Sequence, residues 1–200
     1  IAQISILGSG WGLKFADVDN DGRRDVFVAQ GHVLDTIEKT SSYLKYKQTP
    51  LLIRNTEKEF RNISLASGSA FQQNLSARGL ASGDIDNDGN IDFVISQIDG
   101  SPLILRNNGS NNRWLGVVLK GKTSARHGEG ARVTVTDDSG RKQIFDAGNS
   151  GSYLSSNDPR ILVGLGNKTA VKIEIIWPGG KTQIIENPQM NTYIAIDEQP

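Results

Sequence analysis

Short apolar segments alternate with polar turns along the whole chain, and no apolar run approaches the length of a long helix. The clearest example lies near the C-terminus, where Val171, Ile173, Ile175 and Trp177 occupy every second position. A spacing of two places these side chains on one face of a half-buried strand. Pro178-Gly179-Gly180 then supplies a turn. The pattern predicts an all-β chain.

A polar stretch at residues 107–112 carries no apolar side chain and predicts a domain boundary. We therefore expect one domain at residues 1–111 and a second at residues 112–200. Seven short strands separated by turns are expected in the second domain, which predicts a small β-sandwich or barrel. These strands are expected at residues 114–119, 131–136, 142–145, 160–163, 170–177, 182–185 and 192–196.

Two nine-residue segments beginning at Asp17 and Asp84 share the pattern D-x-D-N-D-G-x-x-D. Their carboxylates repel one another unless a multivalent cation lies between them. Oxygen ligands at alternate positions, with a glycine at the sixth position for a sharp turn, suit Ca²⁺. The pattern predicts two calcium sites. The expected ligands are the side chains of Asp17, Asp19, Asp21 and Asp25 with the carbonyl oxygen of Arg23, and the side chains of Asp84, Asp86, Asp88 and Asp92 with the carbonyl oxygen of Asn90.

The two segments differ from the helix–loop–helix calcium site known as the EF-hand. An EF-hand loop carries a glutamate at its twelfth position, whereas Val28 and Ile95 stand there in this chain. The residues after each loop, 26–28 and 93–95, are β-branched or aromatic and favour a strand. The alternative interpretation is a pair of ordinary Asp-rich turns without a metal.

The repetition extends beyond the aspartate loops. A Gly-Leu pair precedes each loop, and an Arg-Asn pair ends the second apolar run after it, at Arg54 and Arg106. Extra residues at 33–47 in the first copy indicate an insertion with one or two helical turns. Repeats of short strands at this scale predict blade-type sheets. Residues 1–111 are therefore expected to form two blades of a partial β-propeller.

Several short motifs mark the C-terminal part of the chain, and they are distinctive as a set. They are Asn112-Arg113-Trp114-Leu115, Gly128-Glu129-Gly130-Ala131, Gly151-Ser152-Tyr153-Leu154-Ser155, Gly164-Leu165-Gly166 and Trp177-Pro178-Gly179-Gly180. This part resembles the ASPIC/UnbV domain of secreted proteins. The aspartate loops, each followed by a strand, resemble the FG-GAP/VCBS repeats that precede that domain. The resemblance implies a calcium-stabilised module that acts in adhesion or matrix contact.

Charge and composition narrow the choice of partners. The 22 basic and 22 acidic residues balance, and Lys and Arg are scattered, so no nucleic-acid partner is expected. No apolar run reaches the roughly 20 residues of a membrane span. The chain has no cysteine, which excludes disulfides. Extracellular modules bind calcium at the concentrations found outside cells. We expect an extracellular, cell-surface or periplasmic fragment whose signal peptide lies upstream.

Catalytic motifs are missing apart from one misleading match. Residues 116–123 fit the phosphate-binding P-loop pattern G-x-x-x-x-G-K-[ST], but the four middle residues favour a strand and no helix is expected after them. His32 and His127 have no neighbouring ligand pattern, and neither a cysteine nucleophile nor an H-E-x-x-H pair is present. The chain is therefore expected not to be an enzyme.

Together these features predict a non-catalytic module that binds a protein or glycan at the cell surface. Two blades cannot close a ring of four to eight. Exposed sheet edges should then be covered by further blades, by the C-terminal domain or by self-association with a second chain. Three alternatives are a carbohydrate-binding module in which Trp11, Trp114 or Trp177 stacks on sugar, a fragment of a larger propeller enzyme, and a rigid calcium-dependent spacer.

Overall fold

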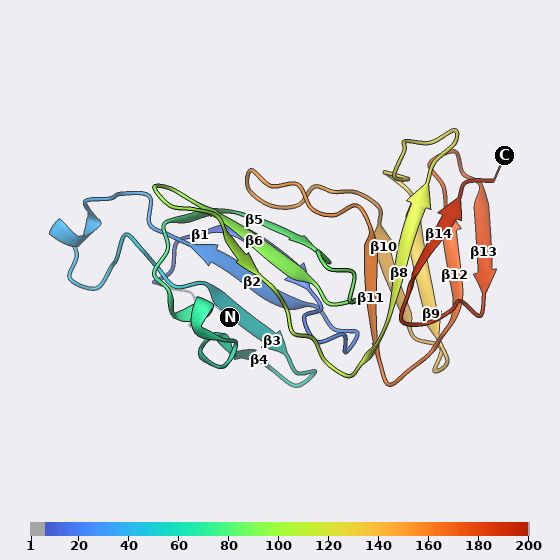
Figure 1. Cartoon of the computed structure of the whole chain (residues 1–200), viewed down its shortest axis with the longest axis horizontal. Helices are drawn as coiled ribbons and strands as arrows, with labels where there is room; N and C mark the ends of the chain where they lie inside the picture. The colour runs from blue at the N-terminus through green and yellow to red at the C-terminus, as the bar shows by residue number, and fades with distance from the viewer. Residues whose placement is uncertain (1–6, 200) are drawn as a thin grey trace.

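The computed structural model describes residues 7–199, and this part of the chain contains fourteen β-strands and three short 3₁₀ turns but no α-helix. The strands form four sheets, two in the N-terminal part and two in the C-terminal part (Figure 1). The prediction of an all-β chain is confirmed. None of the helical segments in the described residues is long and apolar enough to cross a membrane.

The N-terminal part consists of two antiparallel sheets whose strands follow one another in chain order. In both sheets an aspartate loop joins the first strand to the second, so the sequence repeat is also a structural repeat. Two sheets do not close a ring, and the propeller itself stays a prediction. The first sheet contains β1 (Gly10–Ala16), β2 (Asp25–Gln30), β3 (Leu51–Asn55) and β4 (Phe60–Asn62), and the second contains β5 (Ala77–Gly83), β6 (Asp92–Gln97) and β7 (Leu103–Leu105).

One apolar cluster joins the two N-terminal sheets. Phe27 of β2 meets Phe93 of β6 edge-on, with ring centroids 4.6 Å apart, and both side chains are buried. Leu80 of β5 and Ile95 of β6 belong to the same cluster and are fully buried. Full burial of such a side chain stabilises a fold by about 1.5–3 kcal/mol. The two sheets therefore pack as one body.

The predicted insertion at residues 33–47 lies between β2 and β3. It contains one 3₁₀ turn, η1 (Ile37–Lys39), and projects from the end of the molecule far from the C-terminal sheets (Figure 1). Two further turns, η2 (Ser64–Ala66) and η3 (Ser69–Gln72), connect β4 to β5. Phe71 of η3 packs against Phe27, which closes the cluster between the sheets.

The seven strands of the C-terminal part lie close to the positions that the sequence pattern predicts. They form two sheets, ordered β10-β9-β12-β13 and β11-β8-β14, whose buried side chains share one apolar core. This arrangement is a β-sandwich. Its strands are β8 (Arg113–Lys120), β9 (Arg132–Asp137), β10 (Lys142–Asp146), β11 (Ile161–Gly166), β12 (Ala170–Ile176), β13 (Thr182–Glu186) and β14 (Tyr193–Asp197).

Two features define the sandwich. Ile173 and Ile175 of β12, with Trp177 directly after it, are at most 2% exposed, so the predicted alternation marks the core face from Ile173 onward. Val171, the first residue of that pattern, is only half-buried, at a point where the strand register shifts. The last strand, β14, pairs in parallel with β8, whereas the other strand pairs are antiparallel. This parallel pairing carries Tyr193 to the end of β8 that faces the aspartate loops.

The turn that resembles a P-loop is filled by a carboxylate of the chain itself. The residues in the middle of the pattern lie in β8, as expected, and the following turn surrounds buried Glu198. The backbone N–H groups of Lys122, Thr123 and Ser124 donate to Glu198 Oε2, each at 2.8 Å. The hydroxyl groups of Thr123 and Ser124 donate to Oε1 at 2.8 Å. These donors are therefore not available to a phosphate.

We expect Glu198→Gln to lower the melting temperature by roughly 5 °C or more at neutral pH, because an amide nitrogen cannot accept from the N–H groups of this turn. The Ser124 N–H, followed by the other donors, holds the pKa of Glu198 far below its usual value. A lowered pKa contributes stability that is present above the unfolded-state pKa of about 4.3 and is lost as the pH falls below it.

The difference between wild type and Glu198→Gln should therefore shrink as the pH falls from 7 towards 3, measured by thermal unfolding. Exposed Glu186 supplies the matched control, since Glu186→Gln should leave the melting temperature nearly unchanged at each pH. A Glu198→Gln protein as stable as the wild type at pH 7 would contradict the assigned role of the carboxylate.

Candidate metal centre

The two aspartate loops adopt the same backbone conformation. In the loop that leads into β2, Asn20 and Gly22 have φ angles of 56° and 84°. In the loop that leads into β6, Asn87 and Gly89 have φ angles of 61° and 84°. Asn and Gly are the residues that adopt this left-handed region most readily. The sequence repeat therefore encodes a specific turn as well as a charge pattern.

The first aspartate of each loop closes the turn. Asp17 accepts hydrogen bonds from the backbone N–H groups at the fifth and sixth loop positions, at 3.0 and 2.7 Å. Asp84 accepts from Asp88 and Gly89 in the same way, at 3.1 and 2.7 Å. Local bonds of this kind compete successfully with strand pairing in Asp-rich turns. They also bend each loop so that its alternate carboxylates face one another.

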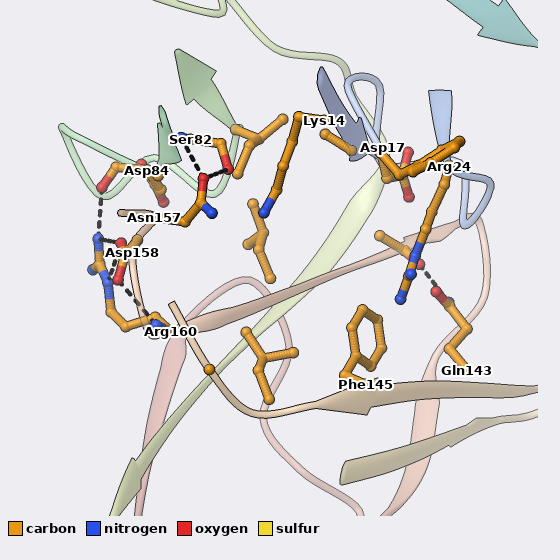
Figure 2. A pocket seen from close by; sticks show the side chains of 18 of the residues that line it. Lys14, Asp17, Arg24, Ser82, Asp84, Gln143, Phe145, Asn157, Asp158 and Arg160 are labelled. Atoms are coloured by element: carbon orange, nitrogen blue, oxygen red, sulfur yellow. Dashed lines mark hydrogen bonds and ion pairs between the residues drawn. The ribbon is translucent and has the colours of Figure 1, made fainter. Parts of the chain in front are cut away.

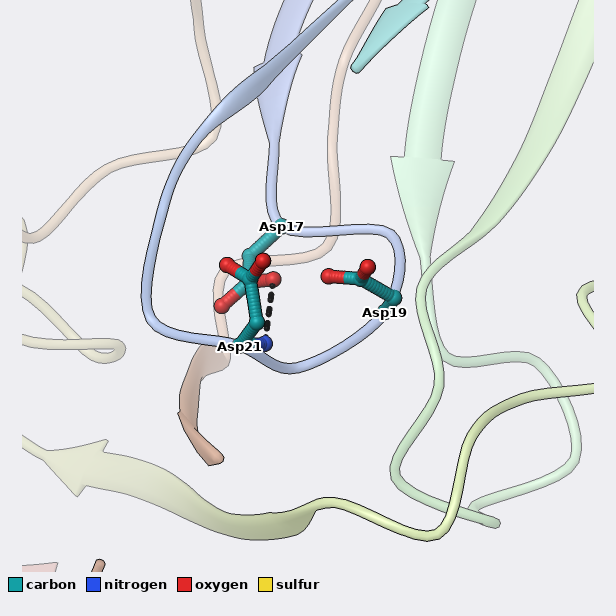
Figure 3. Close-up of side chains that lie close together, drawn as sticks. All are labelled: Asp17, Asp19 and Asp21. Carbon is teal, nitrogen blue, oxygen red and sulfur yellow. Dashed lines mark hydrogen bonds between the residues drawn. The ribbon is translucent and has the colours of Figure 1, made fainter. Parts of the chain in front are cut away.

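Three carboxylates come together in each loop. The grouped residues are Asp17, Asp19 and Asp21 in one loop and Asp84, Asp86 and Asp88 in the other, and each residue offers an oxygen within 4.8 Å of the other two. Figure 3 shows the side chains of Asp17, Asp19 and Asp21 turned toward the inside of their loop. Burial, with added repulsion from Asp21 and Asp19, raises the pKa of Asp17 to about 7. Removal of water thus makes this negative charge costly.

The ninth-position aspartates lie outside these groups of three and hold the start of the following strand in place. Asp25 accepts hydrogen bonds from the N–H groups of Val18, at 3.1 Å, and Asn55, at 2.7 Å. Asp92 accepts from the matching residues of the second repeat, at 2.8 and 2.7 Å. Each of these carboxylates keeps lone pairs that a cation could use. Their role as ligands therefore stays a prediction.

The expected carbonyl ligands at the seventh positions are also still predictions. What the structure shows there is the N–H groups, which donate to the fifth-position aspartates: Arg23 to Asp21 and Asn90 to Asp88, both at 2.8 Å. These bonds hold the fifth-position carboxylates in place. They do not involve the carbonyl oxygens.

Sequence reasoning missed two arginines that touch the aspartates. Arg54 forms ion pairs with Asp19 and, at 3.9 Å, with Asp21. Arg106 pairs in the same way with Asp86 and, at 3.6 Å, with Asp88. The available signal was the recurrence of the Arg-Asn pair, because its Arg neutralises two loop carboxylates and its Asn N–H binds the ninth aspartate.

The contacts of the loop carboxylates fit a hard divalent cation. Asp19 Oδ1 is buried and has no hydrogen-bond partner within residues 7–199, although its other oxygen pairs with Arg54. A buried carboxylate oxygen without a partner is costly. Burial, followed by the charge of Asp21, also raises the pKa of Asp19. A calcium ion prefers six to eight oxygen ligands, and it would satisfy this atom.

The two loops contact each other directly. Asn20 is almost completely buried, and its side-chain Nδ2 donates to Gly89 O at 2.9 Å and to Asn90 Oδ1 at 3.2 Å. Asn107 Nδ2 donates to Val18 O at 2.7 Å, which joins the end of the second repeat to the first loop. The two candidate sites are therefore held in one fixed arrangement.

The C-terminal sandwich covers the second loop. Tyr193 donates its hydroxyl hydrogen to Asp84 Oδ2 at 2.7 Å, and Arg160 donates to Asp84 O at 2.6 Å. Arg160 also lies over the ring of Tyr193, 4.4 Å from its centroid. Gly89 lies against Trp114 so closely that an added Cβ would come within 1.9 Å of the indole. Glycine is therefore required here by packing as well as by its φ angle.

The same sandwich also holds the first loop. The N–H of Gly166 donates to Asn20 O at 2.7 Å, and Arg141 donates to Gly22 O at 2.5 Å. Asn112 Nδ2 donates to Asp19 O at 2.7 Å. Both aspartate loops thus lie between the blade-type sheets and the C-terminal sandwich, and the backbone of each is bound from both sides.

We expect Arg54→Met to lower the melting temperature by a few degrees in the presence of EDTA, because Asp19 loses its counter-charge. Asp21 keeps its ion pair with Arg23, at 2.5 Å. Arg61→Met is the matched control, since the Arg61 side chain is 66% exposed and pairs with nearby Glu59. Exposed pairs of this kind contribute about 0–1 kcal/mol. Both melting temperatures are measured by circular dichroism. If Arg54→Met and Arg61→Met lower the melting temperature equally, Arg54 has no special role.

Comparison with known proteins agrees with the C-terminal part of the sequence interpretation. Residues 121–200 match the family described as ASPIC and UnbV. Over 188 residues the chain is 30% identical to cartilage acidic protein 1 of Homo sapiens and of Mus musculus, covering 90% of this chain but 27% and 28% of those proteins. The Xenopus tropicalis protein of that name is 32% identical over 139 residues, covering 66% of this chain and 21% of the relative.

The chain therefore spans about a quarter of the length of the curated relatives that it matches. The expected ASPIC/UnbV resemblance is supported for the C-terminal sandwich, and most of the chain is similar to part of cartilage acidic protein 1.

Proposed function

We propose that this chain is a non-catalytic, calcium-binding extracellular module in which two bound ions stabilise FG-GAP/VCBS-type blades and their contact with the C-terminal domain. The observation that carries the proposal is the pair of loops that share one sequence pattern, one backbone conformation and one grouping of three carboxylates. A single Asp-rich turn occurs often in proteins. Two matching turns that contact each other instead support binding of the same kind of ligand by both.

The proposed ions act by removing a repulsion. Two carboxylates about 4–5 Å apart repel by roughly 3–4 kcal/mol at an effective dielectric constant near 20, before any offset from a neighbouring cation. Arg54 and Arg106 supply part of that offset in their loops. A divalent ion would supply the remainder and would also fill the empty coordination of Asp19 Oδ1. Calcium affinity should then contribute directly to folding stability.

The extracellular setting rests on the similarity to cartilage acidic protein 1 and on calcium supply. Modules outside cells bind calcium with dissociation constants of about 10⁻⁴ to 10⁻³ M. The proposed working role is adhesion or matrix contact. The carbohydrate-binding alternative receives less support from the tryptophans, because Trp177 is core, Trp114 packs on Tyr193, and Trp11 packs on Tyr153 beneath Arg78.

A calcium titration followed by thermal unfolding tests the proposal. At 10 mM calcium, sites with those dissociation constants add about 1.4–2.7 kcal/mol each. For a chain of this size, that corresponds to a rise of roughly 3–10 °C per site relative to EDTA. Magnesium at the same concentration should produce a smaller rise, because it keeps its waters and needs tighter octahedral geometry.

Asp19→Ala and Asp86→Ala should each remove about half of the calcium-dependent rise. Asp35→Ala is the matched control, because Asp35 is exposed and lies in the insertion outside both loops. Wild-type melting that is the same in EDTA and in calcium would overturn the calcium proposal.

Cation binding should also couple the two halves of the chain. Since the C-terminal sandwich hydrogen-bonds the backbone of both loops, stiffening the loops should stabilise that interface. We expect one calorimetric unfolding transition in calcium and two separate transitions in EDTA, one for the blade-type sheets and one for the sandwich.

Arg160→Met should separate the two transitions even in calcium, because it removes the bonds to Asp84 and Asn87. Arg132→Met is its control, since that arginine pairs with Asp146 on the exposed surface of the sandwich. If two transitions appear in both calcium and EDTA, with the same difference between their unfolding temperatures, the loops do not couple ion binding to the interface.

A further inference from the structure

A cleft of about 370 Å³ lies between the first aspartate loop, the second loop and strand β10 of the sandwich. Its walls include Lys14 of β1, Arg24 just before β2, and Phe145 of β10. Figure 2 shows Lys14 and Arg24 extending from the blade-type sheet into this space, Arg24 toward Phe145 and Gln143 and Lys14 on the side of Asn157. Clefts between domains are common places for ligands.

Neither of these two basic side chains has an acidic partner among the described residues. Lys14 is half-buried and takes part in no ion pair or side-chain hydrogen bond there. Arg24 lies over the ring of Phe145, 5.1 Å from its centroid, and donates one hydrogen bond, to Ile144 O at 3.2 Å. Both therefore keep free N–H donors that face the cleft.

The acidic residues that line the cleft are already engaged. Asp158 pairs with Arg160 at 2.6 Å, and Asp146 pairs with Arg132 at 2.9 Å. Asp17 and Asp84 belong to the loops that bind the calcium ions in the proposed function, and this count of charges rests on that proposal. With both loops loaded, the uncompensated charge in the cleft is positive.

Two neutral side chains of the cleft, Gln143 and Asn157, already donate to backbone carbonyl groups. Gln143 Nε2 donates to Gly164 O at 2.7 Å. Asn157 Nδ2 donates to Asn149 O and Ser150 O, at 3.2 and 3.1 Å. A ligand recognised here would therefore be held mainly by charge-assisted bonds from Lys14 and Arg24 and not by a network of amides.

We propose that this interdomain cleft binds an oxyanion, a carboxylate or sulfate group, between Lys14 and Arg24. Burial, together with the neighbouring Arg24 charge, lowers the pKa of Lys14. A bound anion would relieve that unfavourable environment and favour the charged amine. Arg24 is the eighth residue of the first aspartate loop, but neither it nor Lys14 is an expected calcium ligand, so this site is distinct from the calcium sites.

An NMR titration of the whole chain in 1 mM calcium, at constant ionic strength, tests the site. Sodium sulfate and sodium acetate are added in separate arms and compared with sodium chloride. Saturable shifts of backbone amides near Lys14 and Phe145 are expected with sulfate or acetate but not with chloride. The arm that binds more tightly shows whether the group is a sulfate or a carboxylate. If neither sulfate nor acetate produces saturable shifts, the proposal is overturned.

Lys14→Met and Arg24→Met should each weaken binding by roughly fivefold or more, because each removes one charge-assisted contact. Lys181→Met, which changes an exposed lysine in the turn before β13, should bind like the wild type. Binding that is unchanged in Lys14→Met would refute the assigned site. Calcium-dependent melting of the same Lys14→Met protein verifies its fold.

The two proposals can fail separately. A calcium-dependent rise in melting temperature without anion binding would remove only the cleft assignment. Saturable anion binding that needs Lys14, in a protein whose melting temperature calcium does not change, would remove the calcium proposal and leave the cleft assignment in place.

Discussion

The organisation of this chain depends on the repulsion among carboxylates that two short loops force together. Local hydrogen bonds from loop N–H groups fix Asp17 and Asp84, and the turn geometry then brings the third and fifth positions near them. The chain offsets this repulsion partly with Arg54 and Arg106. In the proposed function, a bound divalent cation offsets the remaining unfavourable energy in both loops.

These loops lie where the two blade-type sheets and the sandwich meet, so their state bears on the whole molecule. Asn20 ties one loop to the other, Tyr193 and Arg160 bind the second loop, and Gly166 binds the first. A change of charge inside a loop would therefore act on hydrogen bonds with strands that are distant in sequence. The interdomain cleft with Lys14 and Arg24 is enclosed by the same elements.

The sequence predicts what is local and periodic. Alternation identified the core face of β12, and the repeated aspartate pattern located two loops of equal conformation. Contacts between distant segments were not predictable, because no local pattern encodes a partner such as Tyr193 for Asp84. Glu198 was missed for the same reason: its donors come from a turn after β8, and one acidic residue in a polar tail carries no distinguishing signal.

The most direct test of the central claim is the number of calcium ions that the folded chain binds, measured by isothermal titration calorimetry. We expect two ions per wild-type chain and one ion in Asp86→Ala, with the remaining site assigned to the loop of Asp17. Binding of no calcium, or of two ions by Asp86→Ala, would contradict the account.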